Sequence, residues 1–127
     1  MNKTIVKPVW LTNQVQLEET LKEVLTSRAV SRFLFLNDWD TPCLTLKRRL
    51  KNVEKLGSNE IVYVVDTFDI PMGLQILRDA IKYSRDVSTT TINNYTGTPM
   101  MVRVHGDNGN YPVPVTYTGS IFAELGL

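Results

Sequence analysis

The chain has 127 residues, 43% of them hydrophobic, which is enough to bury one core. Fourteen Lys and Arg residues against thirteen Asp and Glu give a formal net charge of +1, so no global field points to nucleic acid or a membrane surface. No apolar run approaches the roughly 20 residues needed to cross a bilayer, so no membrane partner is expected.

The N-terminal part predicts a weak strand and a helix. Thr4–Trp10 alternates loosely in polarity, but Pro8 cannot donate to a ladder, so we expect an edge strand at best. Asn13, with Gln16 three residues later, resembles a capping box at the start of a helix. This helix is expected to end near Ser27, and its apolar face carries Leu17, Leu21, Val24 and Leu25.

The next segment predicts a strand, a short turn, a helix and a second strand. Phe33–Leu36 is a continuous apolar run, typical of a fully buried strand, and we place the central strand at Arg32–Asn37. Pro42 suits a first helical turn, and we predict a helix over Pro42–Leu56, closed by Gly57. The β-branched run in Glu60–Asp66 predicts another buried strand, parallel to the first because a helix connects the two.

The second half predicts a helix from Pro71 to about Tyr83, and then a hairpin and a final helix. The remaining elements, in chain order, are a Ser/Thr/Asn-rich loop at Val87–Asn94, a strand at Met100–His105, a turn at Gly106–Asn110, a strand at Tyr111–Tyr117, and a short helix with Ile121, Phe122 and Leu125 facing inward. The whole order is β-α-β-α-β-α-β-β-α, which predicts a mixed sheet with helices on both faces.

Three short motifs resemble those of one family. Trp39-Asp40-Thr41-Pro42-Cys43 resembles the Trp-Cys-Gly-Pro-Cys active-site turn of thioredoxins. Gly97-Thr98-Pro99 resembles the loop whose cis-proline faces that turn, and Gly119 with the last residues resembles the final strand-to-helix turn. The resemblance implies a thioredoxin-like three-layer α/β sandwich, which we expect to form a single domain over residues 1–127 with an insertion around residues 70–94.

The chain departs from the family where chemistry would occur, so the motif is degenerate. Asp40 stands where thioredoxins have the attacking cysteine, and Cys43 is the only cysteine in the chain. Cys43 at a helix N-terminus is a candidate reactive thiol, but a nearby carboxylate disfavours a thiolate, and a small buried hydrophobe is the favoured interpretation. Asp40 is expected to cap the helix rather than act as a general acid or base.

The resemblance also implies a buried Asp–Lys pair that moves protons for the thiols. The corresponding positions fall near Leu34 and Val62, or near Phe35 and Tyr63 after a one-residue slip, and neither pair is a proton carrier. Disulfide reductase activity is therefore not expected, and we predict a redox-inactive protein.

The same turn remains a candidate binding surface. In thioredoxin-like proteins the residue before the cis-proline offers its backbone to an extended partner segment, which assigns that role to Thr98 beside Pro99. Trp39 would lie close by, and tryptophan is enriched at binding hot spots. We therefore take Trp39–Pro42 with Thr98 and Pro99 as candidate binding residues. The alternative is that Pro99 only fixes a turn and Trp39 only covers the end of the sheet.

Other candidate sites are weak. Lys47-Arg48-Arg49 and Lys51 are interpreted as the solvated face of a helix, because no aromatic stacking motif accompanies them, so no nucleic acid partner is expected. Asp38 with Asp40 and the lone His105 form no ligand set of known spacing, so neither a metal nor another cofactor is expected.

The leading hypothesis is a non-catalytic, protein-binding or assembly module that uses the former active-site face. The alternative is a single-cysteine thiol–disulfide exchange protein acting through Cys43. Met1–Leu11 lacks the apolar core of a signal peptide, and a single cysteine suits a reducing compartment, so we expect a cytoplasmic protein. The sequence specifies neither the protein partner nor an oligomeric state.

Overall fold

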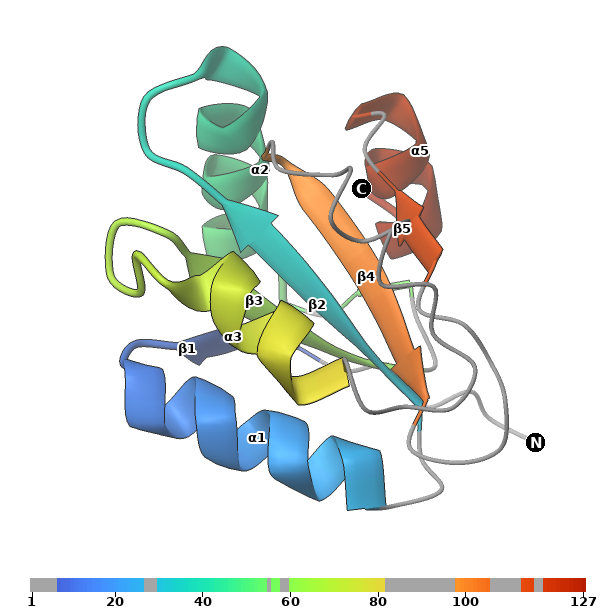
Figure 1. The fold of residues 1–127 in the computed structure, drawn as a ribbon. Coiled ribbons are helices and arrows are strands. Elements are labelled where there is room, and N and C mark those ends of the chain that lie inside the picture. Colours follow the sequence, from blue (N-terminus) through green and yellow to red (C-terminus); the bar gives the residue numbers. More distant parts are fainter. Residues whose placement is uncertain are drawn as a thin grey trace, which may run out of the picture.

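The computed structural model describes residues 7–26, 30–54, 56–57, 60–81, 98–105, 113–115 and 118–127. Within them the chain forms β1 (Val9–Leu11), α1 (Gln14–Thr26), β2 (Val30–Leu36), α2 (Thr41–Asn52), β3 (Ile61–Asp66), α3 (Gly73–Ile81), β4 (Met100–His105), β5 (Val113–Val115) and α5 (Thr118–Leu125). This is the predicted order of strands and helices (Figure 1).

The strands form one mixed sheet in the order β1-β3-β2-β4-β5. β1 and β2 both run parallel to β3, whereas β4 is antiparallel to β2 and β5 is antiparallel to β4. β2 therefore lies at the centre, as its apolar run predicted, and β1 lies at an edge. In the register of the sheet, Leu34 pairs with Val64 on one side and with Met101 on the other.

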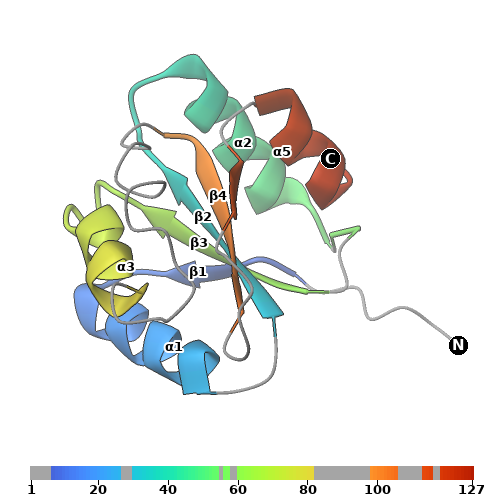
Figure 2. The same ribbon diagram turned by 45° about the vertical axis from the view of Figure 1, so that its right-hand side comes forward.

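β2 is central because both of its faces are apolar. Phe33 and Phe35 point to one face and Leu34 and Leu36 to the other, and all four side chains are fully buried. Figure 2 shows α1 and α3 on one face of the sheet and α2 and α5 on the other. The fold is the predicted three-layer α/β sandwich.

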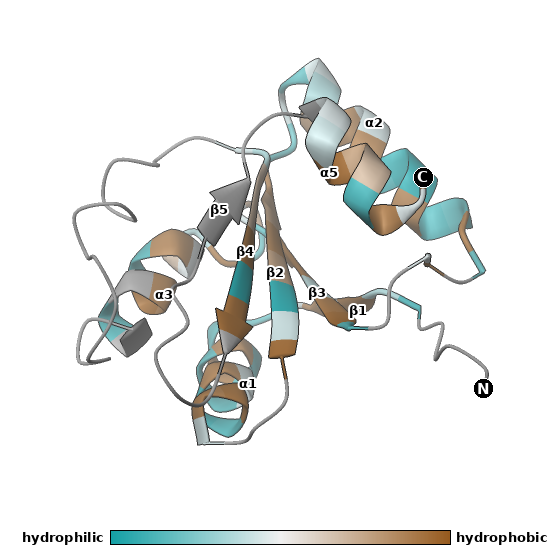
Figure 3. Cartoon of the chain, turned by 90° about the vertical axis from the view of Figure 1, so that its right-hand side faces the viewer, coloured by the Kyte–Doolittle hydropathy of each residue, from teal (hydrophilic) through white to brown (hydrophobic). Residues whose placement is uncertain are grey.

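Each face of the sheet has its own core. One lies beneath α1 and α3 and includes Leu17, Leu21, Val24, Phe33, Phe35, Leu77 and Val102; the other lies beneath α2 and α5 and includes Leu34, Cys43, Leu46, Leu50, Val64, Ile121 and Leu125. The helices that cover them are amphipathic, with apolar residues toward the sheet and hydrophilic residues outside (Figure 3).

Two predicted helix ends differ from the structure. At the start of α1, the Asn13 side chain accepts from the Gln16 N–H at 2.9 Å, but the Gln16 side chain accepts from the Thr12 N–H instead of completing the capping box. At the other helix, the predicted end at Leu56 is wrong, because α2 ends at Asn52 and the following residue is already extended.

Leu56 and Gly57 lie beyond the end of α2 and pack against the C-terminal part of the chain. Leu56 is buried in the core beneath α2 and α5. The Gly57 N–H donates to the Leu125 carbonyl oxygen at 3.1 Å, and a Cβ atom at Gly126 would lie only 3.1 Å from the Gly57 Cα. Gly126 also has a φ of +70°, so two glycines allow this close approach of the chain.

The remaining boundaries agree within a few residues where they can be compared. α3 begins at Gly73 rather than Pro71 and is described as far as Ile81, and β4 has the predicted bounds. Residues 4–6 of the predicted first strand, the predicted loop at Val87–Asn94, the turn at 106–110 and four residues of Tyr111–Tyr117 lie outside the described residues.

Candidate functional site

The turn after β2 is organised by Asn37, a buried residue that the sequence analysis passed over. Its side-chain oxygen accepts from the N–H groups of Trp39 and Asp40, both at 3.0 Å. Its amide nitrogen donates at 2.6 Å to the Asp40 carboxylate and at 2.6 Å to the Thr98 hydroxyl. All of its polar capacity is used within the protein, as a buried amide requires. The one available signal was an asparagine directly after a buried run, a residue type that favours such turns.

Asp40 is the N-cap of α2, which confirms the predicted structural role. Its backbone is extended, with φ −91° and ψ 153°, and its carboxylate accepts from the Cys43 N–H at 2.9 Å. Partial burial acts to raise the pKa of this carboxyl, but the hydrogen bonds from Asn37 and Cys43 outweigh it and lower the pKa. Asp40 is therefore an ionised cap at neutral pH.

Cys43 is a buried core residue, as the favoured interpretation held. Its side chain has no exposed surface and packs with Leu34, Leu46 and Val64. Burial raises the pKa of the Cys43 thiol to about 11, and the Asp40 carboxylate acts in the same direction. Contacts with the Asn37 backbone and the Thr98 side chain lower the pKa but do not compensate. This arrangement favours the neutral thiol.

The Thr98–Pro99 loop lies against the turn, and its peptide bond is cis, as predicted. The Thr98 hydroxyl receives the hydrogen bond from Asn37, which ties the two segments together although 61 residues separate them in the chain. Pro99 is buried. Gly97, the first residue of the predicted motif, lies outside the described residues.

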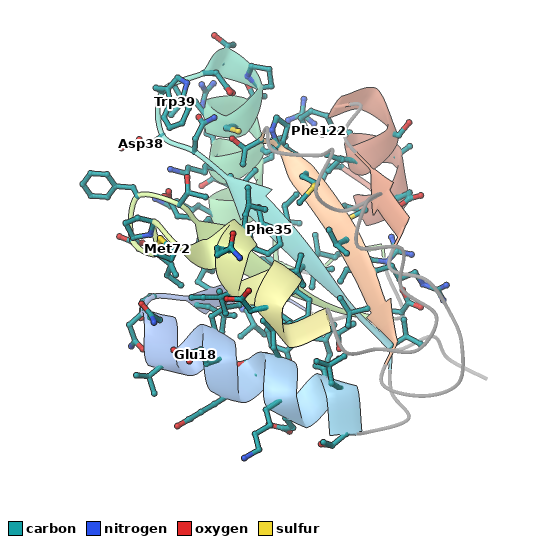
Figure 4. The ribbon with its side chains drawn as sticks, viewed as in Figure 1. Glu18, Phe35, Asp38, Trp39, Met72 and Phe122 are labelled. Carbon is teal, nitrogen blue, oxygen red and sulfur yellow. The ribbon has the colours of Figure 1, made fainter. Side chains whose placement is uncertain are left out.

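Trp39 is 73% exposed, so it does not cover the end of the sheet. Figure 4 shows its side chain at the outer surface of the turn, near Asp38. A groove of about 470 Å³ lies beside it, lined by Asn37, Trp39, Asp40, Thr67, Pro71, Leu74 and Thr98.

The groove brings together only some of the predicted binding residues. Trp39, Asp40 and Thr98 line it, whereas Thr41 and Pro42 are exposed on the first turn of α2 and Pro99 is buried, all outside its lining. The opposite wall comes from residues 67–74, which the sequence analysis did not include. Only the parallel pairing of β3 with β2 places that segment beside Trp39.

The positions that the resemblance assigns to a proton-handling pair are apolar. Leu34 pairs in register with Val64, rather than with the Val62 that motif alignment suggested, and all three side chains are fully buried. Each of the three side chains is apolar, so neither of the two β3 positions places a titratable group opposite Leu34. The core beneath Cys43 therefore offers hydrophobic packing at these positions.

The basic run on α2 is more than a solvated face. Lys47 forms an ion pair with Asp66 at the end of β3, with only 12% and 14% of the two side chains exposed. Arg49 lies over the Phe122 ring at 5.3 Å and Lys51 over the Trp10 ring at 5.7 Å. The prediction of a solvated face was thus wrong for Lys47, whereas Arg49 and Lys51 are exposed as predicted and also contact aromatic rings.

The sequence analysis favoured neither a metal site nor a membrane partner nor a chemical role for His105. In the part of the chain that the structure describes, no group of three or more His, Cys, Asp or Glu side chains could hold a metal ion. Likewise, none of the described helices is long and apolar enough to span a membrane. His105 ends β4, but its side chain is outside the described residues.

No protein-family model matches the sequence, and a comparison with curated proteins yields no match. Solved structures of thioredoxins do resemble the protein. A thioredoxin from Malassezia sympodialis is 13% identical, with a TM-score of 0.55 over 99% of this chain and 93% of that one.

Two plant proteins give the same result. A thioredoxin from Arabidopsis thaliana in its oxidised state is 15% identical, with a TM-score of 0.56 over 94% of this chain and 97% of that one. A thioredoxin from Nicotiana alata is 8% identical, with a TM-score of 0.54 over 98% and 94% of the two chains. Identities this low concern the fold alone, and on that evidence, together with the sheet order and the cis-proline beside the turn, the chain has a thioredoxin-like fold.

Proposed function

We propose that the protein is a non-catalytic, protein-binding or assembly module, a single thioredoxin-like domain that uses the face around Trp39 to hold a partner. The observation that carries the proposal is the contrast at the end of β2. Cys43 has no exposed surface, whereas Trp39, four residues earlier, is 73% exposed beside a groove. The turn thus exposes the Trp39 side chain to a partner and buries the thiol of Cys43.

The chemistry of the turn argues against disulfide reduction. Reducing a disulfide takes two electrons, which a dithiol supplies by forming a disulfide of its own, and this chain has one cysteine. The residue at the attacking position is a carboxylate engaged in capping α2, and it cannot form a mixed disulfide. Cys43 alone is left for the alternative function, in which its thiolate would attack a partner's disulfide, form a mixed disulfide and release the other sulfur as a thiolate. The raised pKa of Cys43 opposes that reaction.

The groove has the features of a peptide-binding surface. Trp39 and Leu74 provide apolar contact, and Thr98 provides a hydroxyl group that the hydrogen bond from Asn37 holds in place. By resemblance, an extended partner segment would lie along the backbone of Thr98. Trp39, already exposed, would lose water on binding, which is the usual origin of a tryptophan hot spot.

A capture experiment with matched variants separates the two functions. The wild type, Trp39→Ala and Cys43→Ser proteins would be immobilised and incubated with extract of the native host. A partner held by the wild type and by Cys43→Ser, but lost from Trp39→Ala, is the expected result. Each variant should melt cooperatively, since Trp39 is exposed and serine is close to cysteine in size.

The opposite pattern would overturn the proposal. A partner retained by Trp39→Ala but lost from Cys43→Ser, and released by reductant, would establish thiol exchange. Reduction of insulin disulfides with thioredoxin reductase and NADPH would also contradict it, if turnover clearly exceeded that of Cys43→Ser. We expect no such turnover from either protein.

A further inference from the structure

The most exposed apolar side chains lie at the end of the sheet where the parallel strands β1, β2 and β3 finish. Among the large hydrophobic residues that the structure describes, the four most exposed are Trp39 at 73%, Phe68 at 71%, Val15 at 62% and Met72 at 55%. Because β1, β2 and β3 are parallel, the segments that follow them emerge at the same edge. Val15 follows β1, Trp39 follows β2, and Phe68 and Met72 follow β3. We call these four side chains the apolar edge.

Two members of the apolar edge, Trp39 and Met72, each line a groove. The groove beside Trp39 has Pro71 in its wall, and the next residue, Met72, lines a second groove of about 560 Å³ between α1 and α3. The apolar part of this second groove comes from Leu21, Leu25 and Ile76 together with Met72. Figure 4 shows Trp39 and Met72 on the same side of the molecule, with Glu18 beyond them on α1. A partner that binds Trp39 could therefore also contact Met72 and the apolar groove between α1 and α3.

The exposed charges next to Trp39 and Phe68 in the chain are negative. Asp38 and Asp69 are exposed next to Trp39 and Phe68 in the chain, and neither forms an ion pair with another described residue. Residues 12–19, 37–45 and 66–77, which surround the edge, contain no Lys or Arg. Among the basic side chains that the structure describes, Lys47 pairs with Asp66, whereas Lys22 lines the same groove as Met72.

We propose that the apolar edge binds a polypeptide segment that carries aromatic or aliphatic anchors flanked by Lys or Arg. This inference rests on the proposed binding function and extends it from Trp39 to Phe68 and Met72. Exposed aromatic side chains supply large contact area at low conformational cost, and the unpaired carboxylates of Asp38 and Asp69 select a cationic partner. A lipid surface would also accept the aromatic rings, but anionic headgroups would repel these two carboxylates.

The test uses a displayed library of random peptides selected on the immobilised full chain. The enriched peptides are expected to combine apolar residues with a net positive charge. One of them, made synthetically, should bind Trp39→Ala and Phe68→Ala about tenfold or more weakly than the wild type, as for hot-spot residues. The double variant Asp38→Asn/Asp69→Asn should also bind more weakly and should lose part of the salt dependence of the affinity.

Matched controls lie elsewhere on the protein. Ile61→Ala removes a partly exposed apolar side chain at the start of β3, the opposite end of the strand, and Glu54→Gln neutralises an exposed carboxylate beyond α2. Both should bind the peptide with affinity within about twofold of the wild type, as surface changes outside a contact do. A loss of affinity in these controls equal to that of the edge variants would overturn the inference.

The remaining outcomes separate this inference from the proposed function. Enriched peptides that need Trp39, but are acidic or indifferent to Phe68→Ala, would overturn the inference and leave the binding function intact. Selection of no peptide that depends on Trp39 would count against both. Sedimentation of the protein with phosphatidylcholine vesicles, abolished by Phe68→Ala, would overturn the inference in favour of a membrane.

Discussion

Two opposing effects act on the thiol of Cys43. A helix N-terminus stabilises a thiolate, whereas burial and a neighbouring carboxylate stabilise the neutral thiol. Here the Cys43 N–H already donates to Asp40, and the sulfur lies in an apolar core with no exposed surface. Burial dominates, so that the pKa rises to about 11 from an ordinary value of 9.0. The position of a cysteine at a helix start is thus no guide to its reactivity once the side chain is buried.

This shift predicts a loss of stability in alkali. Because the unfolded chain releases the Cys43 proton at lower pH than the folded protein, the stabilisation is complete below about pH 9 and is lost between about pH 9 and 11. The free energy of unfolding should fall by about 1 kcal/mol from pH 8 to pH 10, relative to the Cys43→Ser variant measured in parallel. Urea unfolding curves of both proteins at the two pH values measure the difference. Parallel decline of the two curves would show that Cys43 has an ordinary pKa.

At the scale of elements, β2, the turn after it and α2 form the unit that positions Asp40 and Cys43. Asn37 closes the turn, Asp40 begins the helix, and the same asparagine holds Thr98 beside them. Each donor and acceptor of the Asn37 side chain is engaged, which makes the turn rigid without a disulfide. In this unit the Asp40 carboxylate contributes to helix stability, by about 1 kcal/mol for a typical N-cap.

Asp40→Cys tests whether the unit can still support redox chemistry. The new pair of cysteines would be one helical turn apart, so we expect a disulfide with Cys43 on mild oxidation. Turnover on insulin should stay about 100-fold or more below that of an ordinary thioredoxin, because Leu34 and Val64 leave no buried group to exchange protons with Cys43. Free-thiol counting and the reductase assay, made on one sample, measure both.

Asp40→Ser is the matched control, since serine keeps an N-cap oxygen but no thiol. Activity of Asp40→Cys close to that of a thioredoxin would show that the apolar core is no obstacle. If Asp40→Cys forms no disulfide on oxidation, the side chains at positions 40 and 43 do not face one another.

At the scale of the whole molecule, one ion-pair network joins the end of the sheet far from the turn to the last helix. Glu60 accepts from Arg103 of β4 at 2.6 Å and from Arg32 of β2 at 2.8 Å, and Arg32 also reaches Glu124 of α5 at 3.2 Å. The hydrogen bond from Arg103 lowers the pKa of Glu60 to about 2, although partial burial opposes it; the bond from Arg32 adds to the lowering. Carboxylate and guanidinium groups thus link three strand segments to the helix beside them.

Glu60→Gln should therefore weaken the fold in a pH-dependent way. Because the folded pKa lies below the ordinary value of 4.5, the stabilisation is present above about pH 4.5 and is lost as the pH falls toward about 2. We expect Glu60→Gln to lower the free energy of unfolding by about 2 kcal/mol at pH 7, a value discounted for the half-exposed Arg103. The difference from the wild type should shrink steadily toward pH 2 in denaturant titrations. A difference independent of pH would show that packing, not charge, is responsible.

The sequence predicted the fold well where the pattern was local. The apolar run of Phe33–Leu36 identified the central strand, because a strand buried on both faces has an unambiguous composition. The bounds of β4 were also correct. It failed at the end of α2, where Leu56 and Gly57 continue the helical pattern but pack with the C-terminus instead. A contact between residues so distant in the chain leaves no periodic signal.

The sequence by itself determined the chemistry that is possible. One cysteine, a carboxylate in place of the attacking thiol and apolar positions beneath the turn follow from residue identities and need no coordinates. Only the tertiary structure decided which residues share a surface. Asn37 and Thr98 meet because β2 and β4 pair, and Trp39 shares a groove with Pro71 because β2 and β3 run parallel. The sequence predicted that β2 and β3 are parallel, but it did not predict the register or which side chains meet, because strands pair through backbone hydrogen bonds common to all residues.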